Sequence, residues 1–236
     1  MRKCIIALAL VAVLGVTVCA NYTYAFYYDR SPGRDLDFNV FNPMPDRTSY
    51  TISVYDAYGD RACWLTGELS GFDSTFYTMS DHTSASGSRW GIAVISSTQR
   101  LVIGLEYKKN GELVSLDNIY REVPELVPGV PYWAGGYYCT VGNSDTLLIL
   151  LNPSNSRATV SWGMYDQSGD MVFADIVTLS AHESTFVRLG QYAGSSSYSW
   201  GFVDIMMEDA PIIVAMEYTG RGADGLEIDN ITEPYY

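Results

Sequence analysis

The chain has 236 residues, of which 47% are hydrophobic and 17% are charged, and its formal net charge is −13 at pH 7. The apolar content is sufficient for a globular core, and only the N-terminal apolar run is long enough to enter a membrane. An acidic chain repels phosphate backbones and anionic lipid surfaces, so nucleic acid is not an expected partner. Cations and basic protein surfaces remain open.

The first twenty residues have the pattern of a signal peptide. Arg2 and Lys3 precede an apolar run, Cys4–Val18, and small residues follow it. Cleavage after Ala20 or after Ala25 fits the pattern, and an uncleaved membrane anchor is the alternative. The sequence therefore predicts export to the periplasm, the cell surface or the medium, with contact to a membrane only through this segment.

The rest of the chain repeats itself at an offset of 110 residues. A slip of one residue, and later of two, extends the match almost to the C-terminus. The matching pairs include Asn42-Pro43 with Asn152-Pro153, Tyr55-Asp56 with Tyr165-Asp166, Ser74-Thr75-Phe76 with Ser184-Thr185-Phe186, Trp90-Gly91 with Trp200-Gly201, and Asp117-Asn118-Ile119 with Asp229-Asn230-Ile231. Such a register indicates two copies of one structural unit. Tyr22 falls opposite Tyr132, which favours cleavage after Ala20 because the first copy then stays whole.

The chain therefore divides into a signal peptide (1–20), a first module (21–124), a proline-rich linker (125–131) and a second module (132–236). Pro124, Pro128 and Pro131 favour an extended connector between the modules.

Within each copy the pattern is that of strands. In the first copy, Tyr50, Ile52 and Val54 alternate with polar residues before the turn Asp56–Asp60. The second copy reads as strands at residues 137–141, 146–151, 159–165, 171–179, 184–189, 200–207 and 211–218, with a turn at 166–170. About seven short strands per copy predict two tandem immunoglobulin-like antiparallel β-sandwiches, with a barrel as the alternative.

The second copy also resembles a bacterial extracytoplasmic β-sandwich module. The similarity lies in Tyr132-Trp133-Ala134-Gly135-Gly136-Tyr137, Leu150-Leu151-Asn152-Pro153, Tyr165-Asp166-Gln167-Ser168-Gly169 and Asp209-Ala210-Pro211-Ile212-Ile213-Val214-Ala215. This module is similar to the sensory rhodopsin transducer fold and to uncharacterised domains found in tandem on secreted bacterial proteins. The first copy departs from it, with Gln99-Arg100-Leu101 where Asp209-Ala210-Pro211 stands. The resemblance implies a non-enzymatic module related in shape to carbohydrate-binding domains.

Residue patterns for catalysis are weak. The two histidines, His82 and His182, have no nucleophile motif beside them, and no His or Cys pair has the spacing of metal ligands. The acidic turns at 56–60 and 166–170 resemble part of a calcium loop, but Asp and Gly are also what a tight turn requires. We expect no enzymatic activity, no cofactor and no metal.

Four polar residues recur between the copies, namely Arg47, Arg157, Glu106 and Glu217. The glutamates lie in otherwise apolar strands. They are interpreted as hydrogen-bond acceptors for a neighbouring loop or for the recurring arginines.

Aromatic side chains are the best candidates for ligand binding, because their flat faces suit both sugar rings and protein partners. Trp90 and Trp200 match between the copies, so they are expected in the core, and Trp162 follows a buried alternation. The predicted binding patch consists of the remaining candidates, Trp64, Tyr58, Tyr77 and Trp133.

Cys63 and Cys139 are the two cysteines that remain after the signal peptide, and neither recurs in the other copy. They either form a disulfide that ties the modules together or stay isolated thiols. The overall expectation is an exported binding or structural protein that contacts another protein of the envelope, with a glycan-binding accessory module as the alternative.

Overall fold

The computed structural model describes residues 22–83, 89–127, 130–142, 144–193, 200–220 and 226–231. In the first half (residues 22–119) the strands are β1 (Tyr22–Asp29), β2 (Arg34–Phe41), β3 (Thr48–Asp56), β4 (Arg61–Leu69), β5 (Ser74–Thr78), β6 (Trp90–Ser97), β7 (Val102–Lys109) and β8 (Glu112–Ile119). In the second half (residues 132–231) they are β9 (Tyr132–Cys139), β10 (Asp145–Leu151), β11 (Ala158–Asp166), β12 (Met171–Leu179), β13 (Ser184–Arg188), β14 (Trp200–Met207), β15 (Ile213–Thr219) and β16 (Leu226–Ile231). The helical turns α1 (Met79–His82) and η1 (Leu189–Gln191) occupy matching places after β5 and β13. The all-β prediction is confirmed.

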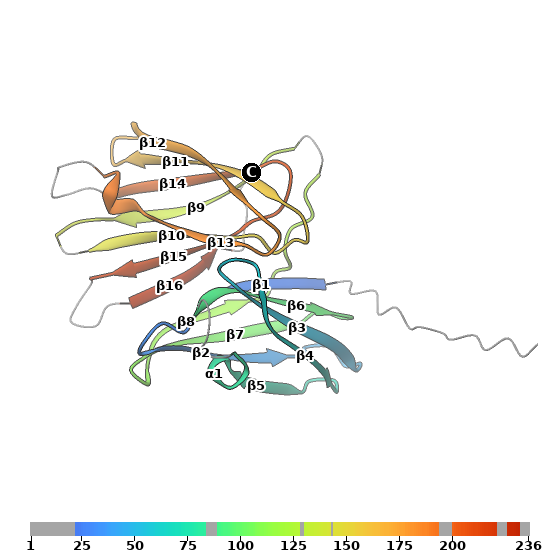
Figure 1. The fold of residues 1–236 in the computed structure, drawn as a ribbon. Coiled ribbons are helices and arrows are strands. Elements are labelled where there is room, and N and C mark those ends of the chain that lie inside the picture. The colour runs from blue at the N-terminus through green and yellow to red at the C-terminus, as the bar shows by residue number, and fades with distance from the viewer. Residues whose placement is uncertain are drawn as a thin grey trace, which may run out of the picture.

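The strands form four antiparallel sheets of four strands each (Figure 1). Sheet A has the order β1-β6-β3-β4, sheet B β5-β2-β7-β8, sheet C β12-β11-β14-β9 and sheet D β13-β10-β15-β16. Strand order and pairing recur between the halves. Asp29 lies opposite Trp90 in sheet A, for example, and Cys139 lies opposite Trp200 in sheet C. Sheet C is therefore the counterpart of sheet A, and sheet D is the counterpart of sheet B.

In the described residues each half has eight strands, one more than the sequence pattern suggests. The additional strands are β8 and β16, which pair with β7 and β15 at the end of sheets B and D. Polar and acidic residues such as Glu112 and Asp117 interrupt the apolar pattern in β8, as is common in edge strands.

The acidic turns close the β3–β4 and β11–β12 hairpins. The Asp56 carboxylate accepts hydrogen bonds from the backbone N–H groups of Tyr58 and Asp60, and Asp166 does the same in the second half. Gly59 and Gly169 have positive φ angles of 85° and 82°, a conformation that glycine adopts without steric cost. The turn interpretation of both segments is confirmed.

Two sandwiches stack against each other through sheets A and D. Side chains from one face of sheet D join the hydrophobic core of the first half, namely Ile149, Leu151, Ile213, Ala215 and Ile228. The opposite face of sheet D, with Leu148 and Leu150, belongs to the second core. Strands β1 and β6 of sheet A and β10 and β15 of sheet D are thus largely buried on both faces, whereas the outer faces of sheets B and C carry strongly exposed side chains such as Phe76 and Phe202.

The connection between the halves runs along sheet A. The backbone N–H of Val123 donates a hydrogen bond of 2.7 Å to the carbonyl of Thr23 in β1. The two halves share apolar contacts. Independent folding of each half as a module, with the boundary in residues 125–131, therefore stays a prediction. The expected signal peptide, 1–20, lies outside the described residues. Among the described helices, none has the length and apolar character to span a bilayer.

Candidate functional site

A buried ionic cluster joins the two halves. Arg34, at the start of β2, donates two hydrogen bonds of 2.9 Å to the Glu217 carboxylate in β15 and one of 2.5 Å to Asp29 in β1. Glu217 is 1% exposed and Asp29 is 3% exposed. The cluster therefore links a charge pair of the first half to a buried carboxylate of the second half through Arg34, whose side chain is 25% exposed.

Burial and charge oppose each other in this cluster. Burial alone lowers the pKa of the Arg34 guanidinium, but the hydrogen bonds and charges of Glu217 and Asp29 raise it above its ordinary value. Arg34 therefore remains a cation. Burial raises the pKa of the Glu217 carboxyl, and the hydrogen bonds from Arg34 offset part of that rise. Arg34 thus opposes the effect of burial on the pKa of Glu217.

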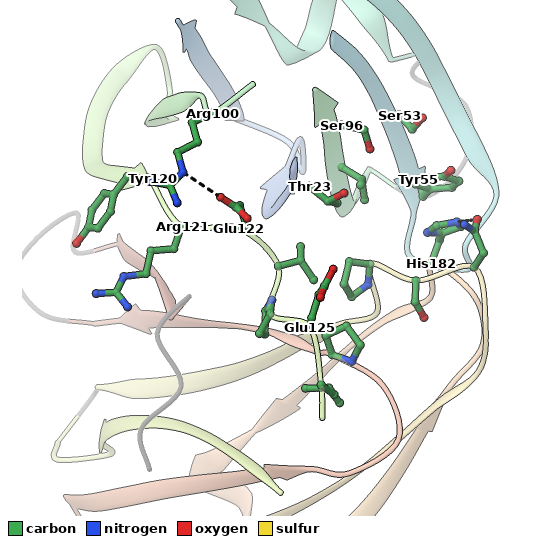
Figure 2. Close-up of a pocket in the computed structure, with 18 residues that line it drawn as sticks. Thr23, Ser53, Tyr55, Ser96, Arg100, Tyr120, Arg121, Glu122, Glu125 and His182 are labelled. Atoms are coloured by element: carbon green, nitrogen blue, oxygen red, sulfur yellow. Dashed lines mark hydrogen bonds and ion pairs between the residues drawn. The ribbon is translucent and has the colours of Figure 1, made fainter. Parts of the chain in front are cut away.

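A cleft of about 1400 Å³ opens between the halves beside the connecting segment. Figure 2 shows Thr23, Ser53 and Ser96 on the sheet A side, with Glu122 and Glu125 of the connecting segment and His182 of the second half around them. Arg100 and Glu122 form an ion pair at 3.6 Å on the rim. The lining is rich in hydroxyl and charged groups, so the cleft suits a polar ligand.

One wall of the cleft is built by a contact between the halves. The ring of His182 stacks on that of Tyr55 with centroids 3.7 Å apart. Its Nε2 lies 2.9 Å from the side-chain oxygen of Asn155, whereas Nδ1 is buried without a hydrogen-bond partner in the described part of the chain. Burial lowers the pKa of the His182 imidazole. The neutral ring is thus the form that fits this wall.

The four predicted binding aromatics lie on three different sheets. Tyr58 is 76% exposed in the β3–β4 turn, and Trp64 is 55% exposed on β4, next to Ser53 of the cleft. Tyr77 instead stacks on Phe38 at 5.0 Å and shares a hydroxyl hydrogen bond with Tyr50.

Trp133 is half-buried on β9 in sheet C, in the second half of the chain. The other three residues belong to the first half. The predicted residues are therefore not assembled as one patch. The reason is that Tyr77 points into its own sandwich while Trp133 belongs to the other one.

A different aromatic surface lies on the outer face of sheet C. Tyr137 and Tyr165 flank Phe202 as its cross-strand neighbours. Trp200 lies two residues before Phe202, and its ring is 6.1 Å from that of Tyr137. Trp200 is 43% exposed and Tyr137 and Phe202 are each 41% exposed. We call Tyr137, Tyr165, Trp200 and Phe202 the sheet C aromatic face.

This face corrects one prediction from the sequence. Trp90 and Trp200 were expected in the core, but both lie on the outer face of their strands. Trp90 meets Phe186 of sheet D edge-on at 5.6 Å, so the contact between the halves covers it, whereas Trp200 remains open to solvent. The expected burial of Trp162 is confirmed, since it is 3% exposed.

The recurring arginines do not bind the recurring glutamates. Arg47 pairs with Glu68 at the surface, and Arg157 is exposed in the loop before β11. Glu217 is instead held by Arg34, and Glu106 lies in β7 of sheet B. The predicted pairing is wrong because Arg47 and Arg157 precede strands of sheets A and C, whereas the glutamates lie in sheets B and D. Arg34 went unnoticed because its counterpart is Ser144, so it does not recur.

The two cysteines also belong to different sandwiches. Cys63 lies on β4 beside the first core, and Cys139 ends β9 and is 6% exposed. Both residues are described, and their sulfur atoms are not bonded to each other. The structure thus favours the alternative of two separate thiols.

Within the described ranges, no group of three or more His, Cys, Asp or Glu side chains is arranged to hold a metal ion.

Comparisons with known proteins do not identify a family. No protein-family model and no curated protein matches the chain. Among solved structures, it is similar to a beta-glucuronidase from glycoside hydrolase family 2 (9% identity, TM-score 0.18, covering 88% of this chain and 23% of that one) and to a Bacteroides uniformis beta-glucuronidase (11%, 0.19, 88% and 25%). A glycosyl hydrolase family 2 member from Bacteroides cellulosilyticus is similar at 11% identity and a TM-score of 0.18, covering 89% and 27%. The chain spans about a quarter of the length of these enzymes, and likenesses this distant carry no conclusion about activity or substrate.

Proposed function

We propose that the protein is exported and acts without catalysis, as a binding protein that contacts another protein of the cell envelope or extracellular space. The outer face of sheet C is the contact surface. The observation that carries this proposal is the exposure of Trp200, Tyr137 and Phe202 side by side on a rigid sheet. Clustered aromatic side chains on a monomer surface are typical of protein interaction sites, since they bury a large apolar area at low entropic cost.

The equivalent face in the first half supports the same function. Tyr27 and Trp90 are the counterparts of Tyr137 and Trp200, and they pack against sheet D of the second half. This face of the repeated unit is thus already used once within the chain to bind a β-sheet. In its second occurrence, Trp200 is 43% exposed and Tyr137 and Phe202 are each 41% exposed.

A non-catalytic role is consistent with how the reactive side chains are used. The His182 ring packs on Tyr55 and bonds Asn155, and the Glu217 carboxylate is held by Arg34. Both groups thus have structural partners that account for their positions.

Glycan binding near the cleft is the second candidate, and one observation favours it. Trp64 is strongly exposed beside a part of sheet A where hydroxyl groups gather, among them Thr51, Ser53, Thr66 and Ser96. An aromatic ring next to hydroxyl groups is an arrangement that can stack on a sugar and bond its hydroxyls.

Sedimentation with an envelope fraction from the source organism tests both candidates. We expect the chain to pellet with the fraction, and Trp200→Ser/Phe202→Ser to reduce its binding by about tenfold or more, as expected for loss of central aromatic contacts. Trp64→Ala is the matched control, because it removes a tryptophan that is also strongly exposed but lies on sheet A, outside the sheet C aromatic face.

Treatment of the fraction separates the two kinds of partner. Protease digestion should abolish the binding and periodate oxidation of glycans should leave it intact. Loss of binding with Trp64→Ala and after periodate, but not with the sheet C variant, would replace the first proposal by the second.

A further inference from the structure

We propose that the partner of the sheet C aromatic face is a second copy of this chain, which docks through the outer face of its sheet B. This inference rests on the proposed function, because it names the partner of the same face. Within the chain, sheet A contacts sheet D. Several residues of this contact have counterparts on the outer faces of sheets C and B.

The aromatic contacts of the internal interface can be formed again between copies. Trp90 packs on Phe186 within the chain, and their counterparts are Trp200 and Phe76. Phe76 lies on β5 in sheet B and is 53% exposed. Sheet C of one copy and sheet B of the next therefore present the same pair of rings at the same register positions.

A second ring contact follows the same rule. Tyr55 stacks on His182 within the chain, and their counterparts are Tyr165 and Phe72. Phe72 is 66% exposed and has a φ angle of 62°, close to the 58° of His182, so its loop presents the ring in the same backbone conformation. A positive φ is uncommon for a bulky side chain, so its occurrence at both Phe72 and His182 indicates that the two loops have the same local geometry.

One polar contact between the halves has a counterpart residue on sheet B. Asn230 accepts from the backbone N–H of Tyr27 at 3.0 Å and donates to the Tyr107 hydroxyl at 2.9 Å. The counterpart of Asn230 is Asn118, which is exposed at the edge of sheet B. Tyr137 and Tyr218 are the counterparts of Tyr27 and Tyr107, and the Tyr218 hydroxyl donates to the Tyr137 carbonyl at 2.8 Å, as Tyr107 does to Tyr27 at 2.7 Å.

The contact between copies lacks the ionic cluster of the internal interface. Cys139 and Ser144 stand where the first half has Asp29 and Arg34, and Asp37 stands where the second half has Leu147. Asp37 is paired with Lys108 on the outer face of sheet B, which makes that face more polar than sheet D. We therefore infer a reversible association that strengthens with protein concentration.

Two different faces meet in this contact, so it is heterologous. Each copy can bind one neighbour through sheet B and another through sheet C, so the assembly extends into a filament unless its rotation closes a ring. The net charge of −13 opposes the association, so higher salt should promote it by screening.

Complementary variants test the proposal on the full, processed chain. Trp200→Ser/Phe202→Ser blocks sheet C, and Phe72→Ser/Phe76→Ser blocks sheet B. All four side chains are more than a third exposed, so the fold should survive, which circular dichroism checks. In sedimentation velocity over a concentration series, the wild-type chain should form species larger than dimers, and each variant alone should remain monomeric.

The decisive sample is a mixture of the two variants. The first variant retains its sheet B face and the second retains its sheet C face, so the mixture should form a 1:1 dimer and nothing larger. Trp64→Ala, which removes an exposed side chain on sheet A, outside both faces, should assemble as the wild type does.

A wild-type chain that stays monomeric at all concentrations would overturn the inference, as would a mixture that stays monomeric or a sheet B variant that still dimerises by itself. If the purified chain stays monomeric while envelope binding still depends on Trp200, the proposed function stands and only the identity of the partner is wrong. If neither assay responds to the sheet C variant, both proposals fail.

Discussion

Arg34 and Glu217 are 183 residues apart in the chain, yet the guanidinium of one and the carboxylate of the other form two parallel hydrogen bonds of 2.9 Å. The pair crosses from sheet B to sheet D, and the Glu217 side chain is 2% exposed whereas that of Arg34 is 25% exposed. Because Asp29 shares the same guanidinium, one cation compensates two buried carboxylates.

We predict that Arg34→Met lowers the free energy of unfolding by about 3–5 kcal/mol, because it leaves buried carboxylates without a counter-charge. Urea denaturation followed by tryptophan fluorescence measures the change. Arg47→Met is the matched control, since Arg47 and Glu68 form an exposed pair, and it should stay within about 1 kcal/mol of the wild type. Equal losses in the two variants would contradict a special role for the buried cluster.

The two hairpin glycines allow a second comparison. Gly59 and Gly169 have nearly the same positive φ, so an alanine at either position is strained by about 1–2 kcal/mol. A Cβ at Gly59 would also lie 2.4 Å from the carbonyl oxygen of Ala181, whereas a Cβ at Gly169 meets nothing within 4 Å. Gly59→Ala should therefore lose clearly more stability in urea than Gly169→Ala. Similar losses would mean that the 56–60 turn does not pack on the second half.

The thiols give a third prediction. In the processed chain beginning at Asn21, alkylation in denaturant without reductant should add two groups, one at Cys63 and one at Cys139. Burial raises the pKa of the Cys63 thiol, so its alkylation in the folded protein near pH 7 should be slow. Intact mass spectrometry measures both outcomes, and a mass without added groups would demonstrate a bridge.

Local features of this fold could be predicted from the sequence. The alternation in β3 and the Asp and Gly residues of the 56–60 turn act within a few residues of each other, so pattern and structure agree there. The eighth strand of each half was missed, because β8 is an edge strand whose side chains need not be apolar.

The binding surfaces were harder to predict because they depend on which face of a strand is covered. In β14, Trp200, Phe202 and Met206 point to one side, and Val203, Ile205 and Met207 point to the other. Large apolar side chains lie on both sides, although Asp204 also lies on the side of Trp200, so alternation alone does not clearly tell the core from the outer face. The partner sheet decides, and it covers Trp90 but not Trp200.

Acid should weaken the contact between the halves through His182. Its Nε2 lies against an amide oxygen and therefore carries the proton, while Nδ1 is buried without a hydrogen-bond partner in the described part of the chain. Protonation of Nδ1 would place a charge where burial disfavours it, so the pKa of His182 lies below its ordinary value of 6.5. A lowered pKa means that the unfolded chain binds this proton more readily, and the stability that the neutral ring contributes is present above pH 6.5 and is lost as the pH falls through the folded-state pKa.

The matched variant for this prediction is His182→Phe, because Phe72 occupies the corresponding position in the first half at nearly the same positive φ. The phenylalanine ring can keep the stack on Tyr55 but cannot titrate. Between about pH 7.5 and about pH 5.5, the range in which histidine changes charge, the wild type should lose more unfolding free energy than the variant. Urea denaturation at several pH values measures the unfolding free energy of both proteins. Subtracting the two curves removes the contribution of the other titrating groups, because both proteins share them. Parallel pH curves would mean that His182 does not titrate in the contact, and a larger loss in the variant would show that the ring is charged there.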